Sequence, residues 1–141
     1  MRVCLLTDTL GDVNGVSRFI RATAERARET GRALRVVTST RMAVPGDSNI
    51  VNVPPIRAWK MPKYEHLEVV LPGRGALARV VSEWRPDVVH VSTPGPVGLA
   101  GRSIAMRLGV PLMGTYHTDF PAYVERLFDD AVMGEMTGGV M

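Results

Sequence analysis

Apolar residues come in short continuous runs, and stretches with helical periodicity separate these runs. The first run, residues 2–7, is apolar without alternation, which is typical of a strand covered on both faces. A turn-rich stretch at 8–15 follows, with Asn14 as the expected N-cap, and apolar positions then recur at helical spacing as far as Thr30. Gly31 is the expected end of this helix.

The same alternation of apolar runs and helical stretches continues along the chain. Strands followed by helices form right-handed crossover units, which make successive strands parallel. We therefore predict an α/β fold: a Rossmann-like, doubly wound parallel sheet with helices on both faces. The further elements predicted are strands at 33–38, 87–91 and 110–115, and helices at 75–84, at 97–108 and beginning at 121–133.

Residues 39–72 interrupt this regular pattern. Prolines punctuate the segment, and only residues 49–53 are predicted to form a strand. Because residues 57–64 mix arginine and lysine with Trp59 and Tyr64, we interpret the segment as a functional surface rather than a linker. Residues 57–64 could meet an anionic head group or form a solvated loop. Trp84, by contrast, is predicted to anchor its helix in the core.

Composition limits the class of protein. A chain of 141 residues with 45% apolar and 22% charged residues indicates one packed domain and excludes a disordered tail. The net charge of +3 comes from scattered arginines, so no nucleic-acid partner is expected. Cys4 is the single cysteine, which excludes a disulfide framework. With neither a signal peptide nor a membrane span in the sequence, we expect a cytoplasmic protein and leave open peripheral attachment to the inner face of the membrane.

Ligands of doubly wound sheets bind beyond the carboxyl ends of the strands, which makes loops 7–16, 91–97 and 115–121 candidates. In the first loop, Gly15 would let a phosphate approach the backbone at a helix N-terminus. An ordinary tight turn is an equally good interpretation of that loop alone. Neither the dinucleotide-binding glycine motif nor the Walker loop is present, which disfavours a nucleotide-dependent oxidoreductase or epimerase.

Histidines supply the remaining candidate chemistry. His117, directly after a predicted strand, could donate a hydrogen bond to a sugar hydroxyl or a phosphate, act as a general base, or simply be paired with Asp119. His90 lies in an apolar strand, where a structural role is favoured. A metal site could be assembled from Asp8, Asp12, His90, His117 and Asp119, but their spacing matches no metal-binding motif, and we expect none.

Several segments together resemble the N-terminal half of glycosyltransferase family 4, the retaining GT-B sugar transferases. The order and spacing of the matching segments cover nearly the whole chain, and the likeness is strongest to lipid mannosyltransferases and sulfolipid-type members. The segments are Thr-Asp-Thr at 7–9, Asn-Gly-Val-Ser at 14–17, Arg-Pro-Asp-Val-Val-His-Val at 85–91, Thr-Pro-Gly-Pro-Val-Gly-Leu-Ala at 93–100, and Gly-Thr-Tyr-His-Thr-Asp-Phe-Pro-Ala-Tyr at 114–123.

The resemblance implies two Rossmann-like domains, a GDP- or UDP-sugar donor as substrate, no cofactor and no required metal. The small-molecule acceptor would be held mainly by the N-terminal domain, with a lipid at the membrane surface as one candidate. Gly15 would approach the donor diphosphate with the help of Asn14, where many relatives have a second glycine. His117 would contact the transferring sugar as the catalytic residue, and Asp12, Thr118 and Asp119 would contact the acceptor.

The resemblance also sets an expectation about domain organisation. In relatives, a C-terminal domain binds the nucleotide, and no such domain is found before Met141. We therefore expect residues 1–141 to be an incomplete N-terminal, acceptor-side domain whose C-terminal donor-binding domain is absent, and expect this fragment to be inactive alone. The alternative is a non-catalytic α/β module that binds a phosphorylated ligand or an anionic lipid.

Overall fold

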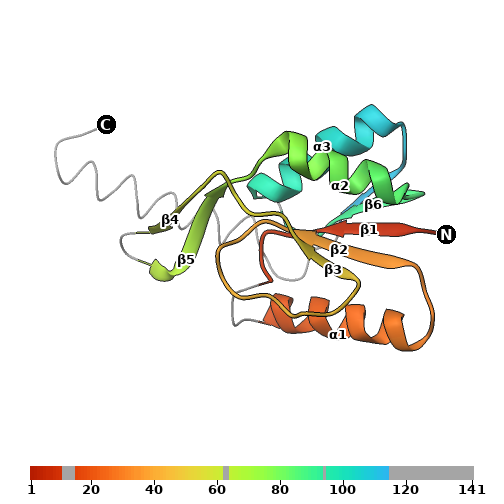
Figure 1. The fold of residues 1–141 in the computed structure, drawn as a ribbon, viewed down its shortest axis with the longest axis horizontal. Helices are drawn as coiled ribbons and strands as arrows, with labels where there is room; N and C mark the ends of the chain where they lie inside the picture. Colours follow the sequence, from red (N-terminus) through yellow and green to blue (C-terminus); the bar gives the residue numbers. More distant parts are fainter. Residues whose placement is uncertain (11–14, 62–63, 94, 115–141) are drawn as a thin grey trace.

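The core of the fold is a five-stranded parallel sheet (Figure 1). The computed structural model describes residues 1–10, 15–61, 64–93 and 95–114. The strand order in the sheet is β3-β2-β1-β6-β7, and every neighbouring pair is parallel. The five strands are β1 (Val3–Leu6), β2 (Leu34–Thr38), β3 (Ile50–Asn52), β6 (Val88–Val91) and β7 (Leu112–Gly114).

Side chains of β1 alternate between two hydrophobic cores, one on each face of the sheet. Leu5 packs in a cluster with residues of helix α1 (Gly15–Glu29), whereas Cys4 and Leu6 belong to a cluster on the opposite face. This is why the strand has no polar alternation: both of its faces are covered.

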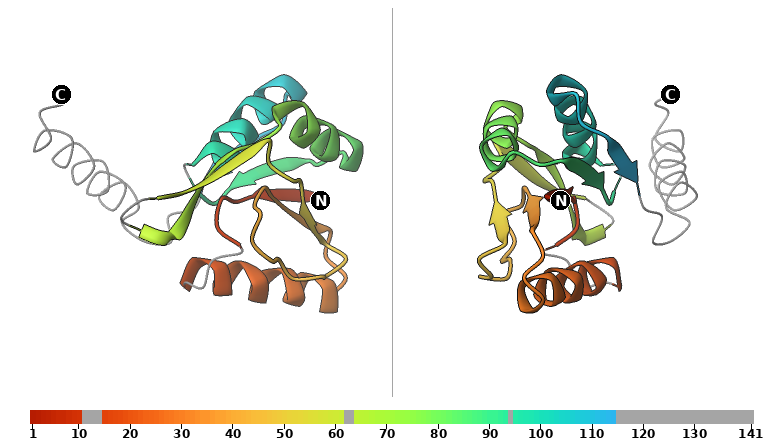
Figure 2. Two further views of the ribbon diagram at one scale, coloured as in Figure 1. Left: turned by 60° about the vertical axis from the view of Figure 1, so that its left-hand side comes forward. Right: turned by 90° about the vertical axis from the view of Figure 1, so that its right-hand side faces the viewer.

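Helices lie on both faces of the sheet, as Figures 1 and 2 show. On one face, α1 buries Val16, Ile20 and Ala24, which are spaced four residues apart. On the other face lie α2 (Arg74–Trp84) and α3 (Pro96–Leu108), whose buried residues join the cluster that contains Cys4 and Leu6. The predicted doubly wound architecture is confirmed.

The helices end where the sequence predicts. Gly31 follows α1, and Gly109 is the C-cap of α3; both have a φ of 69°, in the left-handed region that glycine adopts without strain. Arg85 caps α2 with a φ of 55°, the one non-glycine residue of the described chain with a positive φ. The helix predicted to begin at 121 lies outside the described residues.

The prediction that residues 49–53 form the one strand between 39 and 72 is wrong. In addition to β3, the structure contains an antiparallel hairpin of β4 (Arg57–Met61) and β5 (Tyr64–Leu71), which projects beyond the sheet (Figure 1). Charges placed among its apolar residues conceal the two-residue periodicity of these strands. Among the helices that the structure describes, none is long and apolar enough to cross a membrane.

Candidate functional site

The carboxyl ends of β1 and β6 form the crevice in which ligands of this fold class bind. β1 lies between β2 and β6 in the sheet. The chain leaves β1 toward α1 on one face and leaves β6 toward α3 on the other, so the two connections diverge. Such a topological switch point is the usual ligand-binding position in doubly wound sheets.

Asp8, in the connection after β1, binds the N-terminus of α3. Its Oδ2 accepts a hydrogen bond from Thr93 Oγ1 at 2.6 Å, and its Oδ1 accepts one from the amide of Val97 at 2.7 Å. The amide of Gly98 donates a further bond to Oδ2 at 3.2 Å. Asp8 therefore supplies the carboxylate that caps α3, whose own N-cap residue, Gly95, has no side chain to do so.

Two glycines of α3 are required by this close packing. A Cβ on Gly95 would stand 2.5 Å from the Asp8 carboxylate, and one on Gly98 would stand 1.7 Å from the carbonyl oxygen of Thr93. A side chain at Gly98 would require a shift of the backbone, and one at Gly95 would displace the Asp8 carboxylate from its position. Gly15 differs: among the described residues, no atom beyond its chain neighbours lies within 4 Å of the position of its Cβ.

The environment of Asp8 alters its acidity. Burial raises the pKa of this carboxyl above its ordinary value of 3.8, because the charged form loses hydration. The hydrogen bonds from Thr93, Val97 and Gly98 act in the opposite direction, since they stabilise the carboxylate. Cys4, beneath the same edge in β1, has its pKa raised to about 12 by burial, so it is a protonated core residue rather than a nucleophile.

The first turns of α1 hold the connection that precedes them. Ser17 Oγ donates a hydrogen bond to the Leu10 carbonyl at 3.0 Å, and Arg21 donates another to the same oxygen at 2.7 Å. The start of α1, where Gly15 lies, is thereby fixed next to the end of β1. The sequence offered no signal for this contact, because a carbonyl oxygen can accept from any donor in reach.

Buried hydroxyl groups follow three of the parallel strands at this edge. The Thr7 hydroxyl donates to the Thr9 carbonyl and accepts from the Thr9 amide, and the Thr93 hydroxyl donates to the Asp8 carboxylate. The hydroxyls of Thr38, Ser39 and Ser92 are also buried, yet they have no hydrogen-bond partner among the described residues. This group was not predicted from the sequence, although Thr7, Ser39 and Ser92 directly after β1, β2 and β6 were a visible signal.

Most of the site residues predicted from the sequence lie outside the described residues: Asp12, Asn14, His117, Thr118 and Asp119. Gly15 is the first residue of α1 and is exposed. His90 is partly buried in β6, between Leu5 of β1 and Met113 of β7 in register. In the part of the chain that the structure describes, no three His, Cys, Asp or Glu residues are grouped as metal ligands.

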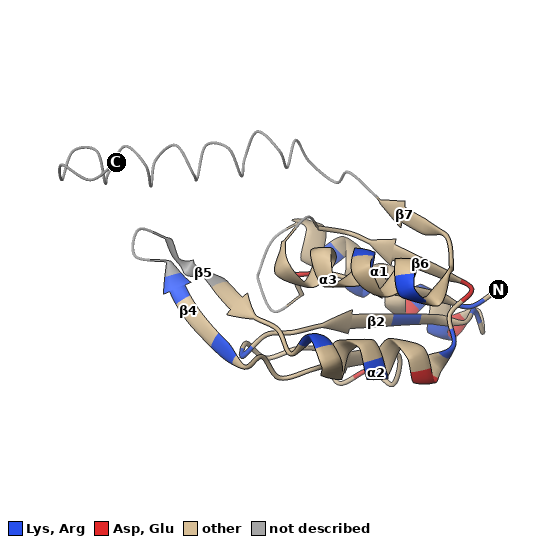
Figure 3. Cartoon of the chain, turned by 90° about the horizontal axis from the view of Figure 1, so that it is seen from above, with Lys and Arg blue, Asp and Glu red and all other residues tan. Residues whose placement is uncertain are grey.

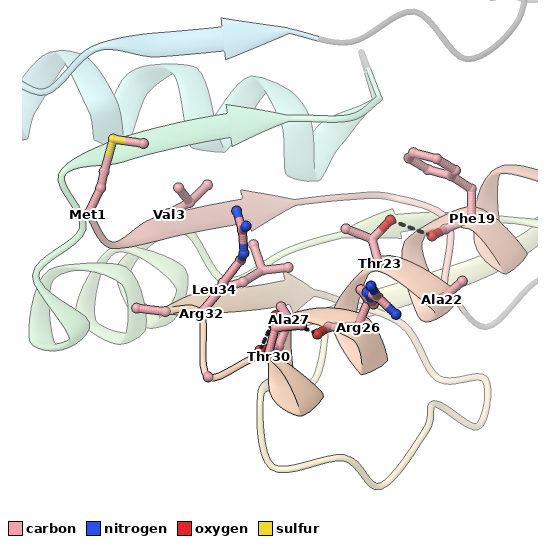
Figure 4. Close-up of a pocket in the computed structure, with 12 residues that line it drawn as sticks. Met1, Val3, Phe19, Ala22, Thr23, Arg26, Ala27, Thr30, Arg32 and Leu34 are labelled. Atoms are coloured by element: carbon pink, nitrogen blue, oxygen red, sulfur yellow. Dashed lines mark hydrogen bonds between the residues drawn. The ribbon is translucent and has the colours of Figure 1, made fainter.

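A groove of about 910 Å³ lies elsewhere, along the flank of α1 (Figure 4). Its lining includes Phe19, Thr23 and Arg26 of α1, together with Met1, Val3 and Leu34 at the amino ends of β1 and β2. Most of this lining is apolar, and it contains none of the residues predicted to carry chemistry. We therefore place the candidate site at the carboxyl edge and not in this groove.

The fold and this edge define a ligand-binding α/β domain, and comparison with known proteins identifies its family. The model of Glycosyltransferase Family 4 matches residues 13–133, so the chain belongs to this family. The resemblance predicted from the sequence motifs is confirmed.

Curated relatives with similar sequences are longer proteins. A GDP-mannose-dependent alpha-mannosyltransferase of Mycobacterium tuberculosis is 32% identical over 87% of this chain and 34% of its own length. The sulfoquinovosyl transferase SQD2 of Arabidopsis thaliana is 28% identical over 82% of this chain and 22% of its own length. The alpha-monoglucosyldiacylglycerol synthase of Streptococcus pneumoniae is 30% identical over 88% of this chain and 28% of its own length. The chain thus spans about a third or less of these relatives.

A solved structure supports the fold. The UDP-GlcNAc 2-epimerase from Methanocaldococcus jannaschii superposes with a TM-score of 0.51 and 17% identity, over 82% of this chain and 31% of that chain. At this identity the likeness concerns the architecture alone.

Proposed function

We propose that residues 1–141 form the acceptor-side domain of a retaining glycosyltransferase that transfers a sugar from a nucleotide-sugar donor to an acceptor. The observation that carries this proposal is the match of the family model to residues 13–133, which contain both Gly15 and His117. GDP-mannose is the donor in the name of a mannosyltransferase relative, and a diacylglycerol is the acceptor indicated by the name of another. A GDP- or UDP-sugar and a lipid are accordingly the first substrates to test.

Gly15 is proposed to receive the donor diphosphate at the start of α1. The amide groups and the dipole of a helix N-terminus attract phosphate, and the absence of a side chain permits close approach. Gly95 and Gly98 are glycines because neighbouring atoms of the chain leave no space, whereas the described residues leave the space beside Gly15 open. This open space supports a ligand rather than packing as the reason for a glycine at position 15.

The hydroxyls of Thr38, Ser39 and Ser92 are proposed to serve polar ligands or ordered water at the same edge. Buried polar groups almost always have a hydrogen-bond partner, and these three have none among the described residues. Each can both donate and accept, which suits the hydroxyl and phosphate oxygens of a nucleotide sugar. Thr38 is the last residue of β2, and Ser39 and Ser92 directly follow β2 and β6; these positions at the carboxyl edge support a ligand there.

The residues that follow β7 are proposed to act on the sugar. β7 ends at Gly114 and pairs in parallel with β6, so the chain enters position 115 at the carboxyl edge. We assign His117 to contact with the transferring sugar, Thr118 and Asp119 to the acceptor together with Asp12, and Asn14 to the loop beside the diphosphate. A second domain, of the kind that would occupy the remaining length of the relatives, would complete the cleft, and the 141-residue chain alone is proposed to be inactive.

The decisive experiment uses a polypeptide in which residues 1–141 continue into such a second domain. Sugar transfer is measured with UDP- and GDP-sugars, and His117→Ala is expected to lower kcat by at least about 100-fold, the usual contribution of a positioned catalytic histidine. Gly15→Val is expected to raise KM for the donor. Gly75→Val, at the start of α2 where the space is equally open, is the control and should leave KM unchanged.

Three results would contradict parts of the proposal. Unchanged turnover in His117→Ala would remove the role of that residue, and transfer by the isolated 141-residue chain would show that no second domain is needed. Equal effects of Gly15→Val and Gly75→Val on KM would assign the change to helix stability instead of donor binding.

A further inference from the structure

One face of the β4–β5 hairpin is apolar and exposed. Trp59 and Leu71 each retain 49% of their accessible surface, and Val69 retains 41%. Ile56, immediately before β4, retains 64%. We call these four residues the hairpin face. Large apolar side chains are scattered singly on most soluble surfaces, so a group of four on one small element requires an explanation.

The four residues form a continuous surface. Trp59 lies directly opposite Val69 in the antiparallel register, and Leu71, two residues further along β5, shares the face of Val69. The amide of Ile56 donates a hydrogen bond of 2.8 Å to the carbonyl of Leu71, which places Ile56 at the end of the same ribbon. Cross-strand neighbours of this kind are in side-chain contact range.

The opposite face of the hairpin is attached to the domain. Val70 is 8% exposed and belongs to the core cluster beneath α2 and α3, and its register partner Ala58 packs against that cluster. The hairpin is therefore held in one orientation, with Trp59, Val69 and Leu71 turned away from the core. Burial of one face and exposure of the other shows that the hairpin face is a surface of the folded domain.

Cations border this face. Arg57 is the register partner of Leu71 and shares the face of Trp59, whereas Lys60 lies at the edge of this face, next to Trp59 in β4 and with Glu68 as its register partner; Arg57 and Lys60 are both exposed. Ile56 lies beside Gly73, the residue before exposed Arg74 at the start of α2. Figure 3 shows basic positions along β4 and at the near end of α2. Trp beside arginine and lysine is the composition typical of a protein surface at the membrane interface.

We propose that the hairpin face docks on an anionic lipid bilayer, with Trp59, Ile56, Val69 and Leu71 entering the head-group region and Arg57 and Lys60 contacting lipid phosphates. The inference rests on the proposed function, since the hairpin projects from the carboxyl edge of the sheet, where the proposed site lies (Figures 1 and 3). A membrane bound there would present a lipid acceptor to the crevice. The hairpin would thus determine the orientation of the domain on the bilayer.

Vesicle sedimentation tests the proposal with the 141-residue chain. Vesicles of phosphatidylglycerol and phosphatidylcholine are expected to bind the chain, and vesicles of phosphatidylcholine alone to bind it less. Trp59→Ser combined with Leu71→Ser is expected to weaken binding at least about tenfold through lost apolar burial. Arg57→Gln is expected to reduce the preference for anionic vesicles about fivefold.

A matched control distinguishes docking through the hairpin face from non-specific hydrophobic adsorption to vesicles. Leu99 and Met106 on α3 are also exposed, at 53% and 73%, but lie on another element. Leu99→Ser combined with Met106→Ser should leave binding unchanged. Equal loss in both double variants, or no binding of the unaltered chain to anionic vesicles, would overturn the proposal.

Tryptophan fluorescence gives a second, local measurement. The chain contains two tryptophans, so Trp84→Phe leaves Trp59 as the single reporter. Brominated lipids should quench its emission in anionic vesicles, and bound chain without quenching would overturn the assignment of this face. Vesicle binding without sugar transfer by the longer polypeptide would refute the proposed function alone. If the longer polypeptide transfers sugar to a water-soluble acceptor but does not bind vesicles, the docking surface alone would be refuted.

Discussion

Asp8 and Thr93 exchange hydrogen bonds across the switch point of the sheet. The amide of Asp8 donates to Thr93 Oγ1 at 2.7 Å, and the same hydroxyl donates to Asp8 Oδ2 at 2.6 Å. The two residues are 85 positions apart in sequence and join the connections that follow β1 and β6. Because both connections border the candidate site, this pair holds the two sides of the site together.

Replacing Thr93 by valine should destabilise the domain. Valine has nearly the same shape but leaves the Asp8 amide without an acceptor and the carboxylate without one donor, a loss of about 1–3 kcal/mol. Urea unfolding followed by circular dichroism measures the change.

Thr38→Val is the matched control for this loss. The Thr38 hydroxyl is fully buried and has no partner among the described residues, so its removal should be neutral or stabilise the unliganded domain by about 0.5–1 kcal/mol. Destabilisation of both variants by the same amount would mean that the Asp8–Thr93 exchange contributes nothing specific.

Gly98→Ala should destabilise the domain by at least about 2 kcal/mol, because its Cβ would stand 1.7 Å from the Thr93 carbonyl oxygen and force α3 away from β6. Gly75→Ala in α2 has open space and should be neutral or stabilising by up to about 1 kcal/mol. Equal unfolding midpoints of the two variants would contradict the close approach of α3.

The raised pKa of Asp8 predicts a particular pH dependence. A carboxyl that binds its proton more tightly in the folded chain contributes stability that is complete below its unfolded pKa of 3.8 and is lost as pH rises through the folded value. The free energy of unfolding of the unaltered chain should therefore fall relative to that of Asp8→Asn as pH increases from 3 to 7. Subtracting the variant removes the titration of other carboxyls. A difference that grows with pH would show that the three hydrogen bonds outweigh burial.

Cys4 should be unreactive while the domain is folded. Its thiol is fully buried, and a pKa of about 12 leaves almost no thiolate at pH 8. Labelling with a disulfide reagent should therefore occur only through unfolding, with a rate that rises steeply in urea. Because Cys4 is the single cysteine, the absorbance change reports this site alone. Rapid labelling in native buffer would contradict burial of β1.

The sequence predicted the parallel sheet because its strands are buried on both faces and are therefore uniformly apolar, as in β1 and β6. The hairpin escaped prediction since only one of its faces is buried, and that face is narrow: Ala58 and Val70 are its described core contacts. In the sequence, Lys60, Pro62 and Lys63 interrupt the pattern of apolar positions. Alternation over so few residues cannot be separated from a polar loop without knowledge of the neighbouring core.

The role of Asp8 could not be predicted from local sequence either. Capping motifs are recognised within a few residues of the helix that they cap, but Asp8 caps a helix that begins at Pro96. The glycine at the N-cap of α3 was an indirect signal, since it leaves the helix in need of an acceptor from elsewhere. Gly15 was identified correctly as the start of a helix because its turn and helix are contiguous in sequence.

The hydrogen bond between Ile56 and Leu71 closes the base of the hairpin, so the chain leaves the sheet after β3 and returns almost to the same point before α2. An excursion with such closely spaced ends can be lengthened, shortened or exchanged without changing the path of the surrounding strands and helices. Variation that keeps Val70 and Ala58 in the core would leave the folding of the sheet intact. The domain is thus built so that its contact surface can diversify in evolution, or be grafted by design, independently of its scaffold.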